Sequence, residues 1–273
     1  MSTRVTLEKN VCSGVLDSLV QRCKTDPNLA SDKAIHVVIN TEKSIGIKND
    51  FIPRIIPLSS CKMYKPRDLR ILLITKDPAG PFRTALAENE STSDLFKMVI
   101  SVRNLKSKYR WARLIKLFKE FDMVVADHRV QHLLPRILGR AFYHSNKKLP
   151  FAVQMSKEVK DKHTRSLETC DAAFVRAQLK SICKNAFYVP NKDNCMSIKI
   201  GEIGVHTSEE MTQNIQDIVQ FLSDKSKRSM GGGILRSGIA ALFVKTNNSV
   251  SLPLYRAPAK NLTLLDENDE IRL

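Results

Sequence analysis

The sequence FDMVVADHRVQHLLPRILGRAFYHSNKKLPFAV, at residues 121–153, carries the pattern that decides the fold. Residues 121–126 are a short apolar run with adjacent valines, which is typical of a strand buried on both faces. Asp127 follows at the position of a helix N-cap, and apolar residues then recur at helical spacing. Pro135 interrupts that run because it lacks an N–H group, so we expect two short helices, with Pro135 opening the second. Residues 150–155 are the next expected strand.

The neighbouring sequence repeats this alternation of strands and helices. Strands are expected to begin near Leu69, Lys97, Phe121 and Leu149. Helices are expected between them at residues 81–88, 109–120 and 129–143. Such regular alternation predicts a small parallel sheet with right-handed crossovers. Polar or charged segments at residues 59–68 and 156–168 are the expected linkers on its two sides.

The two ends of the chain have a different pattern. Before the first linker we expect a helix at residues 6–24, a strand at 35–40, a loop at 41–50 and an extended segment at 51–58. After the second linker we expect helices at residues 172–183 and 209–222, a flexible connection at 226–233, and strands at 197–205, 239–245 and 249–255. Ser208 is the candidate N-cap of the helix at 209–222.

The N-terminal segment cannot close a hydrophobic core alone, because residues 1–64 provide only one helix and one or two strands. The economical arrangement pairs the two ends of the chain and inserts the parallel sheet between them. We therefore predict an α/β protein with two domains. A discontinuous α+β domain comprises residues 1–66 and 159–273, and an inserted parallel-sheet domain comprises residues 67–158.

The composition favours a polyanionic partner. The 44 Lys and Arg residues outnumber 28 Asp and Glu residues, which gives a formal net charge of +16 over 273 residues. Nucleic acid is the preferred interpretation of this excess. We expect no membrane partner, because no apolar run approaches the ~20 residues of a transmembrane helix and no basic amphipathic helix or lipidation signal is found. The N-terminal MSTRVTLEKN lacks the apolar core of a secretory signal.

The cysteines indicate a reducing compartment, either cytosol or nucleus. None of them forms a C-x-x-C motif, so we expect free buried thiols in place of disulfides or a zinc site. The six residues are Cys12, Cys23, Cys61, Cys170, Cys183 and Cys195.

Motifs for catalysis and cofactors are not recognisable. Nucleotide binding needs a glycine-rich turn after the first parallel strand, but this chain has ITKDPAGPF at residues 74–82. The glycines at residues 229–233 are better interpreted as a solvated connection. His128 and His132 have a metal-compatible spacing but lack the glutamate of H-E-x-x-H and a third ligand, so surface histidines are preferred. We predict no catalytic residue, no metal, no cofactor and no small-molecule substrate, and hence a protein that is not an enzyme.

Two segments of the chain resemble a known family. The first matches the pattern D-x-R-V-x-x-L-L-P-x-x-L-G-x-x-F-Y at Asp127, Arg129, Val130, Leu133, Leu134, Pro135, Leu138, Gly139, Phe142 and Tyr143. The second, KTNNSVSLPLY at residues 245–255, resembles K-T-x-x-S-V-x-L-P-I-Y. Both patterns belong to the nucleolar branch of the ribosomal protein L1 family, and the similarity is greatest to the L1-type component of the fungal small-subunit processome.

The resemblance implies a fold and an RNA-binding surface. The implied fold is the two-domain L1-like fold, in which a Rossmann-like domain is inserted into a discontinuous domain that holds the RNA. Carried over to this chain, the contacts come from the first strand with its following loop and from the last strands, and we expect Lys43 and Lys245 to lie together. The implied RNA-binding residues are Asn40, Thr41, Lys43, Lys199, Lys245, Thr246, Asn247, Ser249 and Ser251. Ordinary polar turn residues are the alternative interpretation of both segments.

Clusters of basic residues supply further candidates, with a solvated surface as the alternative for each. The secondary basic patch follows the central helix and consists of Arg136, Arg140, Lys147 and Lys148. The other clusters are Lys106, Lys108, Arg110, Arg113 and Lys116, and Lys225, Lys227 and Arg228. Because aromatic residues are only 6% of the chain, recognition of RNA shape and phosphate is favoured over base stacking.

One difference from ribosomal L1 proteins concerns the final turn. Those proteins have Ser-Thr-Met-Gly-Pro there, whereas this chain has SVSLP at residues 249–253. The resemblance implies a ribosome assembly factor in the nucleus and nucleolus, which binds structured pre-ribosomal RNA beside other assembly factors. The charge and the missing catalytic motifs predict only that the protein binds RNA and is non-catalytic. The alternatives are a protein-interaction scaffold with incidental RNA contact and a structural large-subunit protein.

Overall fold

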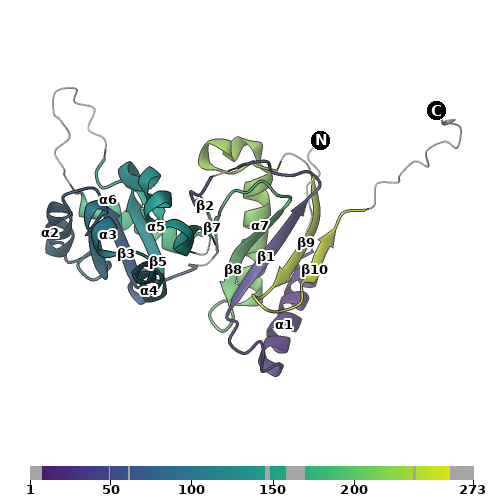
Figure 1. The fold of residues 1–273 in the computed structure, drawn as a ribbon. Helices are drawn as coiled ribbons and strands as arrows, with labels where there is room; N and C mark the ends of the chain where they lie inside the picture. Colours follow the sequence, from purple (N-terminus) through teal and green to yellow (C-terminus); the bar gives the residue numbers. More distant parts are fainter. Residues whose placement is uncertain are drawn as a thin grey trace, which may run out of the picture.

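The computed structural model describes residues 8–48, 50–60, 62–144, 148–157, 170–235 and 238–258, and shows a mixed α/β fold with three sheets (Figure 1). An antiparallel four-stranded sheet contains strands from both ends of the chain. A parallel four-stranded sheet contains strands from the middle, and a two-stranded sheet completes the set. The predicted mixed α/β fold with a parallel sheet is therefore confirmed.

The antiparallel sheet has the strand order β10-β9-β1-β8. Its strands are β1 (Ala34–Thr41), β8 (Cys195–Glu202), β9 (Ile239–Lys245) and β10 (Leu252–Arg256). The central strand β1 alternates between half-buried and buried residues, which is the period of a strand with one covered face. Ile35, Val37 and Ile39 are fully buried, so they define the covered face.

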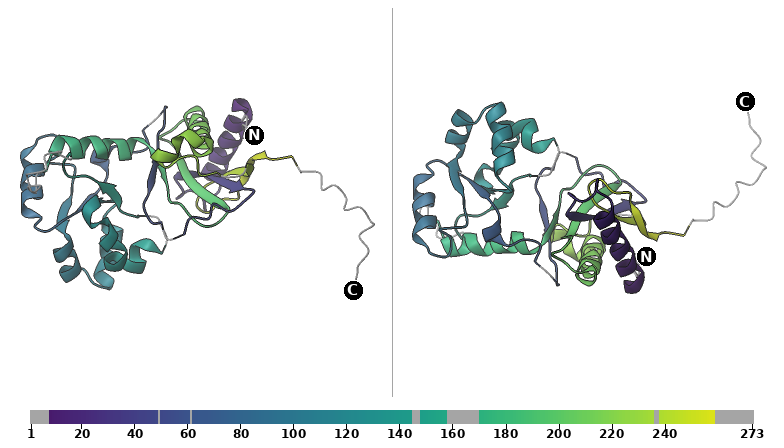
Figure 2. Two further views of the ribbon diagram at one scale, coloured as in Figure 1. Left: turned by 90° about the horizontal axis from the view of Figure 1, so that it is seen from above. Right: turned by 90° about the horizontal axis from the view of Figure 1, so that it is seen from below.

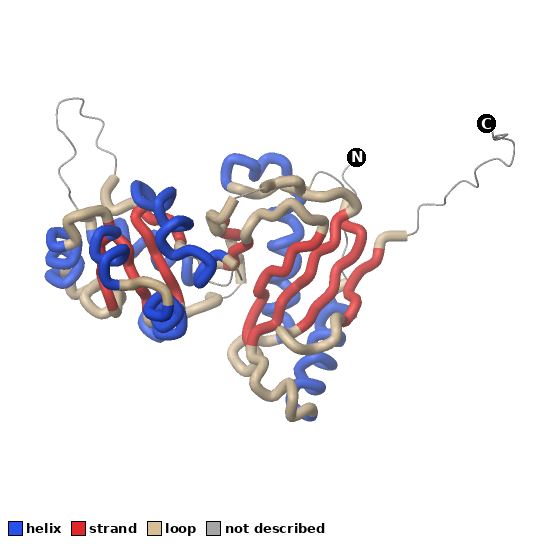
Figure 3. Tube along the Cα trace, viewed as in Figure 1, coloured by secondary structure: helices blue, strands red, loops and turns tan. Residues whose placement is uncertain are grey.

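Two helices cover that face. They are α1 (Lys9–Thr25) and α7 (Ser208–Ser223), and the views from above and below show both on the same side of the sheet (Figure 2). Their apolar side chains join those of β1, β8 and β9 in one core that includes Leu16, Leu19, Ile215 and Ile218. The strands of this sheet lie in front of both helices in Figure 3, so the opposite face carries no helix of the described chain.

The parallel sheet has the strand order β4-β3-β5-β6. Its strands are β3 (Ile71–Thr75), β4 (Met98–Ser101), β5 (Met123–Asp127) and β6 (Phe151–Val153). All residues of β3 and β5 are buried, as their continuous apolar runs predict. The surrounding helices are α2 (Gly80–Glu88), α3 (Val102–Lys108), α4 (Ala112–Glu120), η2 (His128–Leu133), α5 (Leu134–Tyr143) and α6 (Ala172–Lys184).

The third and smallest sheet lies in the segments that connect the antiparallel and parallel sheets. Strand β2 (Arg54–Ile56) pairs with β7 (Ala186–Tyr188) in antiparallel register. Helix α6 precedes β7 and contributes Val175, Leu179 and Cys183 to the core on one side of the parallel sheet. Residues 51–58 were expected to be extended, but β7 was not predicted, because a three-residue strand has too few side chains to show a period.

Several expected boundaries need correction. The helix expected at 109–120 starts later, as α4 at Ala112, because Trp111 has a φ of 50° and a non-helical backbone. The separate helix α3 at residues 102–108 was not predicted. The N-cap of α7 is Thr207 and not Ser208: its hydroxyl accepts a hydrogen bond from the Glu210 N–H, and the Glu210 carboxylate accepts one from the Thr207 N–H.

The connection expected to be flexible at residues 226–233 also differs. It contains the short helix η3 (Lys225–Met230), which the Asp224 side chain caps. Gly232 and Gly233 pack tightly behind it, since a Cβ at Gly233 would lie 2.6 Å from the Asp224 carbonyl oxygen. Most of the linker expected at 156–168 lies outside the described residues.

Candidate nucleic-acid interface

The uncovered face of the antiparallel sheet, here called the open face, presents three rows of side chains. Directly paired residues of neighbouring strands share a face, so the register fixes the members of each row. The first row is Lys199, His36 and Lys245; the second is Ser197, Val38, Phe243 and Pro253; the third is Cys195, Asn40, Ala241 and Arg256. Successive rows are two residues apart along β1, which corresponds to about 7 Å.

The first row is the cationic end of the open face. Lys245 is half-buried. Burial, and after it the charge of Asp193, raises the pKa of Cys195, and the positive charge of Lys245 only partly opposes this rise. Lys199 is placed differently, because its ammonium group donates to the Tyr64 hydroxyl at 2.9 Å and to the Glu202 carboxylate. Lys245 is therefore the lysine of this row that is better placed to meet a phosphate.

The other rows add side chains that the sequence analysis did not select. Arg256 is exposed at the edge strand and extends the positive charge to the third row. Phe243 is half-buried in the second row, between Val38 and Pro253. The Oδ1 atom of Asn40 is buried and accepts no hydrogen bond from the described residues. Strand alternation from Lys245 would have placed Phe243 on the same face, but Arg256 follows a bulge that alternation alone does not reveal.

The turn between β9 and β10 is held by a buried carboxylate. Asp32 accepts hydrogen bonds from the Thr246 hydroxyl at 2.8 Å, the Asn248 N–H at 2.8 Å and the Asn248 side-chain amide at 3.0 Å. The Ser249 hydroxyl accepts a hydrogen bond from the Thr246 N–H at 2.8 Å. Thr246 and Ser249 thus hold the turn in place. Of the predicted RNA-binding residues in this segment, Asn247 and Ser251 are exposed.

The opposite end of β1 is arranged around Thr41. This residue is buried, and its hydroxyl donates to the Lys43 carbonyl oxygen at 2.7 Å and to the Asn194 carbonyl oxygen at 3.1 Å. The hydroxyl shapes the loop, while the Lys43 side chain is exposed beyond the end of the strand.

The expectation that Lys43 and Lys245 lie together is wrong. Lys245 pairs with His36, whereas Thr41 pairs with Ile239 at the other end of β9. His36 and Thr41 are five residue steps apart along β1, which corresponds to about 17 Å. The antiparallel register explains the error, because the end of β9 lies beside the beginning of β1. An RNA that touched both lysines would have to cross the open face.

The secondary basic patch is also divided. The Lys148 ammonium group is turned inward, where it donates to the Phe118 and Phe121 carbonyl oxygens at 2.7 and 2.8 Å. Burial lowers the pKa of this amine. Arg136 and Arg140 are exposed on α5, and Lys147 lies outside the described residues.

Other candidates are solvent-facing or structural. The lysines and arginines at 106–116 and 225–228 are exposed. Asp127 is fully buried and holds the Arg129 guanidinium through two oxygens, while the neighbouring His128 Nδ1 lies 3.4 Å from Asp127. Within the described ranges no group of three His, Cys, Asp or Glu side chains could hold a metal ion. No helix in that part of the chain is long and apolar enough to cross a membrane.

The cysteines are less uniformly buried than expected. Cys12, Cys23 and Cys183 are buried, Cys170 is half-buried, and Cys195 is exposed on the open face. Cys61 lies outside the described residues. Burial raises the pKa of Cys183 to about 12, so this thiol stays protonated at neutral pH.

The chain is similar in sequence to known proteins over most of its length. Residues 19–250 match the model of the ribosomal protein L1p/L10e family. Ribosome biogenesis protein UTP30 of Saccharomyces cerevisiae is 52% identical over 250 residues, which are 92% of this chain and 91% of that protein. A putative ribosome biogenesis protein of Schizosaccharomyces pombe is 28% identical over 92% of this chain and 65% of its own length. Ribosomal L1 domain-containing protein 1 of Mus musculus is 25% identical over 86% of this chain and 52% of its own length. The chain thus spans about half to two thirds of these last two proteins.

Proposed function

Because the chain belongs to the ribosomal protein L1p/L10e family, we propose that it is a non-catalytic ribosome biogenesis factor that binds structured pre-ribosomal RNA. The relative with 52% identity is named a ribosome biogenesis protein and matches almost end to end, which supports the same role for this chain. The relative from Schizosaccharomyces pombe carries a similar description. The proposed place of action is a nucleolar pre-ribosomal particle, with the small-subunit processome favoured, where other assembly factors are its neighbours.

The open face is the observation that carries the RNA-binding proposal. Two of its cationic side chains, Lys245 and Arg256, belong to the first and third rows, with the half-buried ring of Phe243 between them. Lysine and arginine neutralise phosphates, while amides and hydroxyls such as those of Asn40 and Ser197 can bond to ribose and phosphate oxygens. A formal net charge of +16 adds long-range attraction for RNA.

We also propose the predicted division into two domains, with residues 1–66 and 159–273 as the RNA-binding domain and residues 67–158 as the inserted Rossmann-like domain. Pairing of β1 with β8 and β9 supports the discontinuous domain. Helix α6 follows the proposed boundary, but its buried apolar side chains pack on the parallel sheet, so by its contacts it groups with the inserted unit.

Salt-dependent binding tests the proposal. Filter binding to hairpin RNAs transcribed from pre-ribosomal sequence should show log K falling linearly with log salt concentration. Replacing both Lys245 and Arg256 with glutamate should reduce the steepness of this slope by about 2, one for each lost phosphate contact. The matched control replaces Arg176 and Lys180, two exposed cations of α6, with glutamate and should keep the wild-type slope. A flat salt response, or an equal loss in the control, would contradict the proposed site.

A protein-interaction scaffold is the second candidate function. The observation in its favour is an exposed apolar groove on the parallel-sheet side of the molecule. Treating native particles with ribonuclease separates the two candidates, because an RNA-tethered factor should be released and a protein-tethered factor should remain bound.

A further inference from the structure

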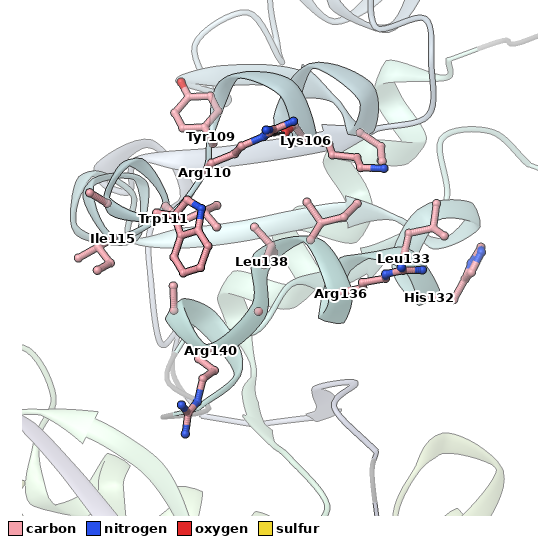
Figure 4. A pocket seen from close by; sticks show the side chains of 16 residues that line it. Lys106, Tyr109, Arg110, Trp111, Ile115, His132, Leu133, Arg136, Leu138 and Arg140 are labelled. Carbon is pink, nitrogen blue, oxygen red and sulfur yellow. Dashed lines mark hydrogen bonds between the residues drawn. The ribbon is translucent and has the colours of Figure 1, made fainter.

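A broad groove of about 1360 Å³ lies beside the parallel sheet, between α4 and the η2–α5 segment (Figure 4). One wall comes from α3, the following turn and α4, and the other comes from η2 and α5. Figure 4 shows Trp111 and Ile115 on one side of the groove, and Leu133, Arg136 and Arg140 on the other. The groove shares no residue with the open face.

Large apolar side chains are unusually exposed in this groove. Trp111 is 88% exposed, Ile115 is 53% exposed and Leu133 is 42% exposed. Contiguous apolar surface of this kind marks sites of protein interaction more often than single exposed residues do. The unused apolar surface on both walls is therefore available to a ligand.

The turn that carries Trp111 holds the indole at the surface. Its φ of 50° is a backbone conformation that residues with a Cβ rarely adopt. Hydrogen bonds from the Arg113 N–H to the Arg110 carbonyl and from the Leu114 N–H to the Trp111 carbonyl, both 3.0 Å, fix the turn. The turn therefore defines the backbone position from which the Trp111 indole projects into solvent.

The charges around the groove have one sign. Lys106, Arg110, Arg136 and Arg140 line it, and none of its lining residues is acidic. An occupant must therefore offer apolar side chains to the walls and negative charge to the rim. RNA offers the charge but prefers aromatic platforms for its bases, and the groove has aliphatic side chains on most of its walls. Besides Trp111 and the imidazole of His132, the lining includes Tyr109, which is half-buried and directs its hydroxyl to the Met98 sulfur at 3.7 Å.

We propose that this groove docks an acidic amphipathic helix of a partner protein. Apolar side chains along one face of that helix contact Trp111, Ile115 and Leu133, and carboxylates beside them pair with Arg136 and Arg140. Docking of a helix into a groove between two helices uses side chains at helical spacing as anchors, and tryptophan and arginine are the residues most often dominant in such contacts. The proposal does not depend on RNA binding at the open face.

The fluorescence of Trp111 provides a direct test, because this is the only tryptophan of the chain. The full chain is titrated with two synthetic peptides of equal length that share one stripe of leucines at helical spacing. One peptide has glutamate at its solvent-facing positions and the other has lysine. The glutamate peptide should shift the Trp111 emission to shorter wavelength in a saturable manner, with an affinity about tenfold or more above that of the lysine peptide.

Charge reversal makes the test specific. A variant with Arg136→Glu and Arg140→Glu should prefer the lysine peptide, a gain that misfolding cannot produce. The control with Arg176→Glu and Lys180→Glu, which changes the net charge equally, should behave as the wild type does. The proposal is overturned if the glutamate peptide causes no shift, if both peptides bind equally, or if charge reversal leaves the preference unchanged. It is also overturned if a single-stranded RNA oligonucleotide quenches Trp111 and displaces the glutamate peptide.

Discussion

Replacing Asp32 with alanine should destabilise the antiparallel sheet, because this carboxylate joins segments that are 214 residues apart in the sequence. Asp32 is 7% exposed, and the hydroxyl of its partner Thr246 is fully buried. Removing the carboxylate deletes three hydrogen bonds and leaves that hydroxyl without its acceptor. The segment before β1 then loses its attachment to the turn between β9 and β10.

The size of the effect follows from these three bonds. A hydrogen bond to a charged group contributes about 1.5–3 kcal/mol, and bonds to one shared carboxylate are not additive. The Asp32→Ala change should therefore lower the free energy of unfolding by about 3–5 kcal/mol.

The variant should also respond differently to acid. Burial by itself raises the pKa of Asp32, but hydrogen bonds from Thr246 and Asn248 outweigh burial and hold the pKa below its usual value. A depressed pKa contributes stability that is present above the unfolded value of about 3.9 and is lost as pH falls through the lower folded value. Below about pH 4 the wild type should lose this contribution, and Asp32→Ala should have none to lose.

Urea denaturation followed by circular dichroism measures both effects. The control is Asp94→Ala, since Asp94 is exposed and should change stability by less than about 0.5 kcal/mol. If the free energy of unfolding of Asp32→Ala lies within about 0.5 kcal/mol of the wild-type value, the structural role of the carboxylate is refuted. If the wild type and Asp32→Ala lose the same free energy of unfolding when the pH falls below about 4, the argument from the lowered pKa of Asp32 is refuted.

Two further predictions concern a glycine and a cysteine. Gly233→Ala should destabilise the protein by about 2–4 kcal/mol, because the residue has a φ of +59° and its Cβ would meet backbone atoms at 2.6 and 2.9 Å. Gly14→Ala, where α1 leaves open space for a Cβ, should instead stabilise the protein by about 0.5–1 kcal/mol. Thermal denaturation should therefore show a lower melting temperature for Gly233→Ala and a higher one for Gly14→Ala. Iodoacetamide at mildly alkaline pH should modify the exposed Cys195 before the buried Cys183, as read by peptide mass spectrometry. Hairpin RNA should slow the reaction of Cys195, and an unchanged rate would place the RNA elsewhere.

The sequence predicted the parts of the molecule whose pattern is local. Continuous apolar runs identified β3 and β5 because both faces of these strands are buried. The later start of α4 at Ala112 was missed because no glycine or proline marks the non-helical backbone at Trp111. The inward position of Lys148 was missed as well, because no sequence pattern distinguishes a lysine that donates to buried carbonyl oxygens from a solvated lysine.

The candidate site needed information that a linear pattern does not contain. Lys245 and Asn40 were selected from the family resemblance, and the register places both on the open face. The same register separates Lys43 from Lys245 and brings Arg256 to the third row. Strand direction and a bulge decide these positions, and both arise from pairing between segments far apart in the sequence.

The central position of β1 has a consequence for how the molecule is made. Its neighbours β8 and β9 begin at Cys195 and Ile239, so the ribosome synthesises them long after β1 has emerged. The parallel sheet requires only residues 71–153 for its strands and can assemble meanwhile, since shorter loops close at a lower entropic cost. Pulse-labelling hydrogen exchange during refolding should accordingly protect β3 and β5 before β1, and the reverse order would contradict this sequence of events. Strand β1 is thus translated before its partners and is among the last strands to be paired, and its apolar side must be shielded from aggregation until β8 and β9 have been synthesised.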